Sequence, residues 1–167
     1  MALNSNQFMQ SVENGFCDRN TCAFNPLPVV VNSTQSTAIG LGVAVTLANV
    51  TANTISQVVK SAVSGAGTTA TSVFGMTFYT THNLAKQKGA GARIEILPLG
   101  SGAIIYLTAS EAITAGQLVS QVVSSGKIQV ADAGEQVIGQ ALISASADGD
   151  LIPVILNQPV NTIVPSA

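Results

Sequence analysis

The sequence predicts an all-β fold, and three observations lead to that prediction. From Val29 onward, short runs rich in Val, Ile, Thr and aromatic residues alternate with clusters of Gly, Ser, Asn and Asp, which is typical of strands joined by turns. Helix signals are weak, and the best internal candidates are single turns around residues 81–86 and 111–115. No apolar run approaches the roughly 18 residues that are needed to span a bilayer.

The first 28 residues differ in composition from the rest of the chain. Phe8, Phe16 and Phe24 stand among Asn, Gln and Ser, and the segment ends at NPLP. A helix over Asn4–Val12 would be short, and an isolated helix of that length is marginal in water. We therefore expect residues 1–28 to form an extended N-terminal arm that is ordered by what it packs against, either its own β domain or a partner.

Ten runs within a β-rich domain over residues 29–157 are expected to form strands. Each combines β-branched or aromatic side chains with flanking turn residues. The runs are Pro28–Val31, Val43–Ala48, Ile55–Lys60, Val73–Tyr79, Arg93–Leu97, Ile104–Thr108, Leu118–Val123, Lys127–Ala131, Ile138–Ile143 and Leu151–Leu156. Residues 158–167 then remain as a C-terminal tail.

Three residues of the later runs have a specific meaning for the backbone. Gly116 stands where a loop must turn sharply into the run at Leu118–Val123. Gly139 inside a strand indicates a bulge or a close approach of another backbone. Pro153 cannot donate a ladder hydrogen bond, so it predicts an edge strand or a bulge.

A weak internal repeat divides the β-rich domain into possible half-units at 29–99 and 100–157. The order GVAV, TISQVV, SVFGMTF and GAGARIEIL in the first half is followed by GQLV, GKIQVA, QVIGQAL and ADGDLIPVIL in the second. The spacing between equivalent points falls from about 74 to about 58 residues. The sequence therefore raises the hypothesis of a duplicated β unit.

Charge is sparse, and this excludes some classes of function. Only 8% of the residues are charged, against about 25% in ordinary soluble domains. The six basic residues form no cluster, so the electrostatic footprint of a nucleic-acid-binding protein is missing. Low charge with many β-branched residues also leaves exposed strand edges prone to pair with other chains, which favours self-association.

Glycosylation and disulfide formation would both depend on export from the cell. The start, MALNSNQFMQ, lacks the basic and apolar regions of a signal peptide, so we expect a protein made in the cytoplasm and no membrane partner. Without a secretory signal, the glycosylation sequons at Asn32 and Asn49 carry no meaning. Cys17 and Cys22 cannot by themselves fill a zinc site; two free thiols, or a disulfide formed after release from a reducing cell, remain open.

No residue pattern predicts catalysis, a cofactor or a metal site. His82 is the only histidine, and no GxSxG nucleophile accompanies it, so a loop histidine is expected. The segment GAGTTA at 65–70 lacks the following helix and acidic residue of a dinucleotide site. Asp148 and Asp150 flank a glycine as turn residues, without the spacing of an EF-hand.

The order of motifs in the second half resembles a known family. EAITAGQLV, GKIQVADA, EQVIGQAL, SASADGD and LIPVIL, in that order, are similar to the C-terminal half of tailed-bacteriophage capsid cement (head decoration) proteins. The earlier SVFGMTFYTTHN and GARIEILPLGSGAIIYLTAS resemble the preceding segment of that family. The resemblance covers about Val43–Leu156, and it is carried by the order of loose Gly and aliphatic motifs. The cysteine-containing arm has no counterpart in it.

The resemblance implies a β-clip-like or related small barrel module that is a structural virion protein and not an enzyme. Such a protein would bind the outer surface of a phage head and clamp neighbouring major capsid protein subunits, as a homotrimer or alternatively a dimer. The apolar arm residues that would contact the capsid are Leu3, Phe8, Phe16 and Phe24. Two alternatives stay open: a β-clip module that binds a sugar or acid at the AITAGQLV loop, and a head fibre or receptor-binding component.

Overall fold

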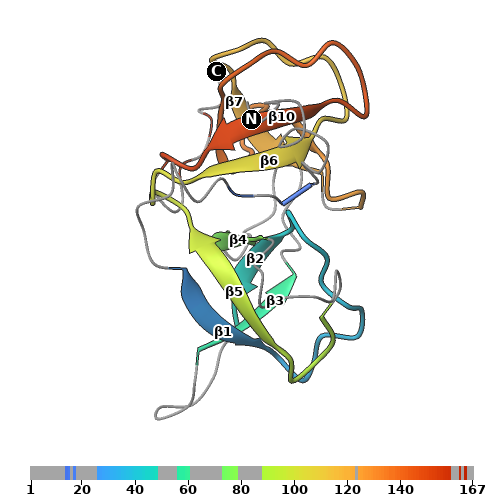
Figure 1. Ribbon diagram of the computed structural model, residues 1–167, viewed down its shortest axis with the longest axis vertical. Coiled ribbons are helices and arrows are strands. Elements are labelled where there is room, and N and C mark those ends of the chain that lie inside the picture. The colour runs from blue at the N-terminus through green and yellow to red at the C-terminus, as the bar shows by residue number, and fades with distance from the viewer. Residues whose placement is uncertain are drawn as a thin grey trace, which may run out of the picture.

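The computed structural model describes residues 14, 15, 17, 26–48, 56–60, 73–78, 88–122, 124–158, 162 and 164. These residues contain ten strands and no helix, so the predicted all-β fold is confirmed. The strands divide into two units of five, which lie one above the other along the long axis of the molecule (Figure 1).

The first unit is a closed barrel of β1 (Leu27–Val31), β2 (Ala44–Leu47), β3 (Gln57–Lys60), β4 (Gly75–Thr77) and β5 (Arg93–Pro98). The order around the barrel is β1-β3-β2-β4-β5. All its pairings are antiparallel except β1 with β3. The side chains that fill its interior are mostly β-branched, as expected for strands that face a small core; they are Val29, Val31, Ile39, Val43, Val45, Val58, Ile94 and Ile96.

The second unit contains β6 (Ile104–Thr108), β7 (Leu118–Gln121), β8 (Ile128–Val130), β9 (Gly139–Ala141) and β10 (Leu151–Ile155). Its order is β6-β10-β9-β7-β8. An isolated parallel bridge between Ala109 and Ile128 connects the two ends of this sheet, and the N–H of Ser110 donates to the carbonyl of Ile128 at 2.7 Å. The second unit is therefore also nearly closed.

Each of the ten predicted runs coincides with one strand, and most strands are shorter than the run. β1 begins one residue before its run, at Leu27, and β5 ends one residue after its run, at Pro98. Residues 55, 79 and 123 of those runs lie outside the described residues. Gly116 has a φ of 89°, which fits the sharp turn that the sequence predicts there.

Gly139 and Pro153 show how the backbone of the second unit is packed. A Cβ at Gly139 would lie 2.5 Å from the carbonyl oxygen of Ile155, so the predicted close backbone approach is present. The expectation of an edge strand at Pro153 is wrong, because β10 pairs with both β6 and β9. The carbonyl of Pro153 accepts from the N–H of Leu142 just beyond the end of β9, so the missing donor falls where that pairing stops.

The two units repeat one pattern of strand pairing. In each, the first strand pairs antiparallel with the fifth and parallel with the third. In each, the second strand pairs antiparallel with the third and the fourth, and the fourth pairs with the fifth. In the second unit the parallel contact is the single Ala109–Ile128 bridge. The two units therefore share one pattern of strand pairing, which is what a duplicated unit would have.

The repeat extends to single residues. Equivalent positions in the two registers include Gly42 and Gly116, Val45 and Val119, Gly75 and Gly139, and Gly91 and Gly149. Gly75 illustrates the match, because a Cβ there would lie 2.6 Å from the carbonyl oxygen of Leu97, as one at Gly139 would from Ile155. The same close approach of the fourth and fifth strands thus requires glycine in both units.

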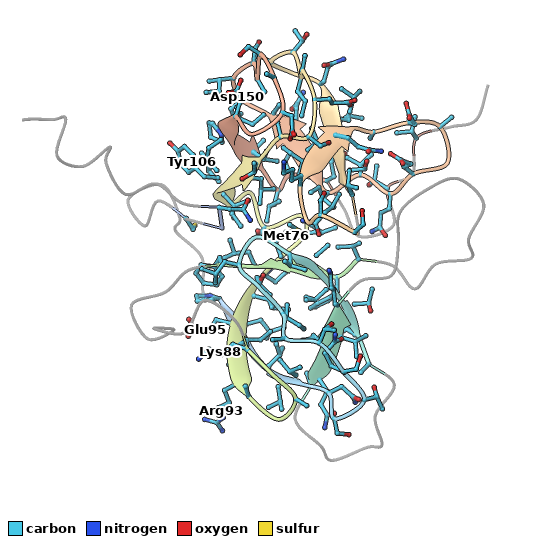
Figure 2. The ribbon with its side chains drawn as sticks, turned by 90° about the vertical axis from the view of Figure 1, so that its right-hand side faces the viewer. Met76, Lys88, Arg93, Glu95, Tyr106 and Asp150 are labelled. Atoms are coloured by element: carbon cyan, nitrogen blue, oxygen red, sulfur yellow. The ribbon has the colours of Figure 1, made fainter. Side chains whose placement is uncertain are left out.

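A shared hydrophobic core joins the units. Ala44, Met76 and Leu97 of the first unit cluster with the interior of the second unit and are at most 2% exposed. Met76 lies between the units in Figure 2. The barrel thus has an interior of its own, and its outer face at this end is buried against the second unit.

Two glutamine side chains add hydrogen bonds across the same junction. The Oε1 of Gln121 accepts from the N–H of Ala44 at 2.6 Å, and its Nε2 donates to the carbonyl of Gly42 at 2.7 Å. Gln136 pairs in a similar way with the backbone of Val73, at 2.7 and 3.1 Å. Each side-chain amide thus donates to a carbonyl and accepts from an N–H of the first unit, as the backbone of a neighbouring strand would.

Candidate functional site

The apolar arm residues that the resemblance assigns to capsid contact lie outside the described residues; they are Leu3, Phe8, Phe16 and Phe24. Before residue 26, three residues of the arm are described, Asn14, Gly15 and Cys17, and all three contact the protein's own β units. Leu27 and Pro28 belong to β1, so the arm ends before the boundary at residue 28 that the sequence suggests. The N–H of Gly15 donates to the carbonyl of Tyr106 at 2.7 Å, and Cys17 forms an antiparallel bridge with Ile105. The base of the arm therefore runs along the outer edge of β6.

Asn14 connects this arm base to both units at once. Its Nδ2 donates to the carbonyl of Leu41 in the first unit at 2.8 Å, and its Oδ1 accepts from the N–H of Thr108 at 2.9 Å. Gly15 and Gly42 meet here without side chains, since a Cβ on Gly15 would lie 2.6 Å from the nitrogen of Gly42. An arm that leaves this point begins at the junction of the two units.

Cys17 belongs to the shared core and is only 6% exposed. It is disulfide-bonded, and Cys22 is the only other cysteine of the chain. Of the alternatives left open by the spacing of the two cysteines, the disulfide is therefore the one present.

The strand edges of the described part are largely occupied. The barrel has none because it is closed, and the outer edge of β6 carries Gly15 and Cys17. At β8, Ser110 donates to the carbonyl of Ile128, and the N–H of Val130 donates to Glu111 Oε1 at 2.8 Å. Edge-to-edge pairing between chains is thus disfavoured, so a contact with another molecule has to use faces or loops.

Glu135 is the most enclosed carboxylate of the described residues, at 7% exposure. Burial alone would raise the pKa of Glu135. Hydrogen bonds from Ser120 Oγ at 2.6 Å, the N–H of Asp132 at 3.0 Å and Gln129 Nε2 at 2.9 Å outweigh that effect, so the pKa is lowered from 4.5. The carboxylate fixes the loop between β8 and β9, a structural role.

The SASADGD loop is organised by its last carboxylate. Asp150 accepts from the N–H and the hydroxyl of Ser146 and from the N–H of Ala147, which lowers the pKa of Asp150. Asp148 instead makes an ion pair with Lys127 at 2.6 Å on the surface. Across the described residues, no three His, Cys, Asp or Glu side chains gather as metal ligands would.

Other sequence candidates are placed as follows. Asn32, part of one sequon, is 9% exposed and its side chain is hydrogen-bonded to Thr34 and Gln57, so it is not an accessible acceptor. His82 and the GAGTTA segment lie outside the described residues. Within the part of the chain that is described, no helix has the length and apolar character to cross a bilayer.

No known family model matches the chain, and no curated protein is detectably similar to it in sequence.

Reasoning from the sequence missed the residues that hold the molecule together as one body. Asn14 lies in a polar stretch, Gln121 lies inside a predicted strand, and Gln136 belongs to the motif EQVIGQAL, but nothing in these patterns assigned the three side chains a role between the units. A signal was present for Gln121, because it follows the apolar LVS run at a strand position where a β-branched residue would be expected. A polar amide at the end of an otherwise apolar strand indicates a buried hydrogen-bonding partner.

Proposed function

We propose that this chain is a structural virion protein that binds the outer surface of a phage head and stabilises the capsid by clamping neighbouring major capsid protein subunits. The observation that carries the proposal is the rigid double β unit with occupied strand edges and an arm anchored at its junction. A clamp must resist deformation, and the shared core with the Gln121 and Gln136 amides supplies that stiffness.

The motif order behind the resemblance coincides with real elements of the second unit. EAITAGQLV leads through the Gly116 turn into β7, EQVIGQAL supplies β9 with its Gly139, and LIPVIL is β10. The resemblance therefore rests on a sequence of strands and turns that build one unit.

Surface chemistry also suits dense packing on a shell. With a net charge of −2, neighbouring copies repel one another weakly. Occupied edges keep such a low-charge β protein from forming open-ended strand pairs before it reaches the shell. In this proposal the protein is made in the host cytoplasm, associates with copies of itself and ends on the outside of the virion.

The arm is proposed to reach the capsid with the apolar side chains that precede its anchored base. Each apolar side chain buried in a partner contributes roughly 1.5–3 kcal/mol before ordering costs. Several arms on one assembly would add avidity. Because Asn14 is fixed at the junction, the residues before it would start from a defined point on the molecule.

The proposal is tested by adding the purified protein to heads that lack it. Decorated heads are expected to melt at a higher temperature than bare heads in calorimetry, and saturation is expected at a fixed copy number. Equal melting of bare and decorated heads, or no binding at all, would contradict the proposal.

The contribution of the arm is tested with matched variants. Replacing Leu3 and Phe8 by Ser is expected to weaken binding to heads, whereas replacing Asn4 and Gln7 by Ser on the same segment is expected to leave it unchanged. Both pairs precede Asn14, so the docked base stays intact. Equal binding by the two variants would move the contact to the β units.

A further inference from the structure

The internal repeat reveals a surface that is covered in one unit and open in the other. In the first unit, four apolar side chains are 0–5% exposed because the second unit lies on them. Three belong to β2, β4 and β5, and the fourth follows β4; they are Ala44, Met76, Leu97 and Phe78. We call these the first-unit face. The equivalent positions of the second unit are Leu118, Gln140, Leu142 and Ile155, the second-unit face.

Among the described residues, the second-unit face is less covered than the first-unit face. Leu142 is 42% exposed, whereas the equivalent Phe78 is 5% exposed. Leu118, Gln140 and Ile155 are partly exposed. Thr162 and Val164 of the C-terminal tail form hydrogen bonds with the backbone of residues 134–137, which precede β9 and are not part of this face.

The partner of the first-unit face is known, because it is the second unit of the same chain. The side chain of Gln121, at the end of β7, forms hydrogen bonds there with the backbone of Gly42 and Ala44. In the repeat, the position equivalent to Gln121 is Leu47 at the end of β2, since Gln121 pairs with Ile128 as Leu47 pairs with Val58. Leu47 is 47% exposed.

We propose that copies of this chain associate head to tail, with the second-unit face of one copy against the Leu47 end of the first unit of the next. The contact would repeat between chains the packing that already joins the two units within a chain. Two of the three large apolar side chains that are exposed among the described residues, Leu142 and Leu47, then lie on opposite sides of one interface.

Charge and strand edges both favour a second copy as the occupant. No residue of the second-unit face is charged, and neither is Leu47, so like-charge repulsion does not oppose the contact. Pairing through edges is disfavoured, as described above. A head-to-tail contact forms a ring if the rotation closes and a filament if it does not, and a ring agrees with the proposed trimer.

The contact is expected to be weak in the free protein. The second-unit face as defined consists of four side chains, whereas a standard stable interface uses roughly 20–30 residues per partner. A shell that holds copies side by side would raise their effective concentration and favour the same contact. This inference deepens the self-association part of the proposed function, but its test uses the free protein and needs no shell.

Sedimentation velocity over about 1 µM to about 1 mM protein covers the range in which so small a contact would associate. Wild type is expected to shift reversibly from monomer to a larger species. Leu142→Lys and Leu47→Lys should each weaken this association by on the order of 100-fold, because a lysine is desolvated without a partner. Ala90→Lys adds the same charge at an exposed loop and should behave as wild type.

Mixing the two impaired variants is the decisive experiment. L142K keeps an intact Leu47 end and L47K keeps an intact second-unit face, so an equimolar mixture is expected to form a 1:1 dimer that neither variant forms alone. Should either variant melt below wild type, Leu142→Ser and Leu47→Ser replace the lysines in the same mixing scheme.

Three results would overturn the inference: monomeric wild type at every concentration, unchanged association in L47K, or no complex in the mixture. The second of these would indicate a contact between two identical faces, and the first would mean that no second copy covers the second-unit face in solution. Heads could still bind the protein in any of these cases, so the proposed function stands or falls separately.

Discussion

Replacing Gln121 by Leu should weaken the junction between the two units more than any other single polar change there. The Gln121 side chain is 6% exposed and makes three hydrogen bonds to backbone: from Ala44 N–H at 2.6 Å, to Gly42 O at 2.7 Å and to Gly126 O at 2.8 Å. Leucine keeps most of the volume but makes none of them. One buried donor and two carbonyls then lose their partners.

The expected cost follows from these three bonds. At about 1 kcal/mol of net stability for each bond, with a further 1–3 kcal/mol where a buried donor stays unpaired, the loss is about 3–5 kcal/mol. For a chain of this size, 1 kcal/mol corresponds to roughly 2–4 °C in Tm, so Tm should fall by on the order of 10 °C. The matched control is Gln117→Leu, because Gln117 makes one exposed side-chain bond, to Thr114 N–H.

Urea unfolding followed by circular dichroism measures the free energy, and hydrogen exchange at the amide of Ala44 reports the junction directly. Exchange at Ala44 should accelerate in the Gln121 variant and stay unchanged in the Gln117 variant. A loss below about 1 kcal/mol, equal to that of the control, would refute the reasoning that these hydrogen bonds hold the units together.

Three further outcomes are expected. Gly139→Ala should cost about 2–3 kcal/mol in urea unfolding, because its Cβ would meet backbone at 2.5 Å, whereas Gly40→Ala, with its nearest atom at 3.7 Å, should cost far less. Asn14→Ala should cost about 1–2 kcal/mol through two lost bonds between units; an unchanged Tm would show that the arm base is not anchored as described. The pKa of Glu135 is lowered, so the stabilisation that this carboxylate provides is present above pH 4.5 and is lost as the pH falls from there through the folded pKa. The difference in unfolding free energy between wild type and Glu135→Gln should therefore shrink below pH 4.5. A difference that stays constant with pH would contradict this.

The strands and the repeat could be predicted because their causes are local. A run such as IIYLT between turn residues leaves few options other than a strand, and β6 occupies exactly the residues of that run, Ile104–Thr108. Gly42 and Gly116 mark the same turn in both units because only glycine adopts their positive φ without strain. Such signals survive in a single sequence, since each depends on a few adjacent residues.

The long-range contacts could not be predicted for the opposite reason. Gln121 meets Gly42 across 79 positions of the chain, and Asn14 meets Thr108 across 94. Neither contact leaves a periodic trace in the sequence. The placement of Pro153 went wrong because the rule that confines proline to edges assumes a ladder that continues on both sides, and here β9 ends beside it.

The two units carry different residues at equivalent positions, so the two ends of the molecule differ in surface chemistry. At the positions where the first unit carries Arg93 and Glu95 on β5, the second unit carries Leu151 and Pro153 on β10, as the shared registers show. Lys88, Arg93 and Glu95 accordingly lie on the lower unit in Figure 2, away from the junction.

This asymmetry gives the molecule a direction. The first unit has its apolar face covered by its own chain and its outer strands charged, whereas the second unit keeps an uncharged face partly open around Leu142. A body whose two units differ in charge on equivalent strands, β5 and β10, cannot bind a surface equally well in both orientations. If the chain acts as a clamp on a shell, the charged strands are the side suited to water or to polar groups of the shell, and the apolar face is the side suited to a neighbouring copy.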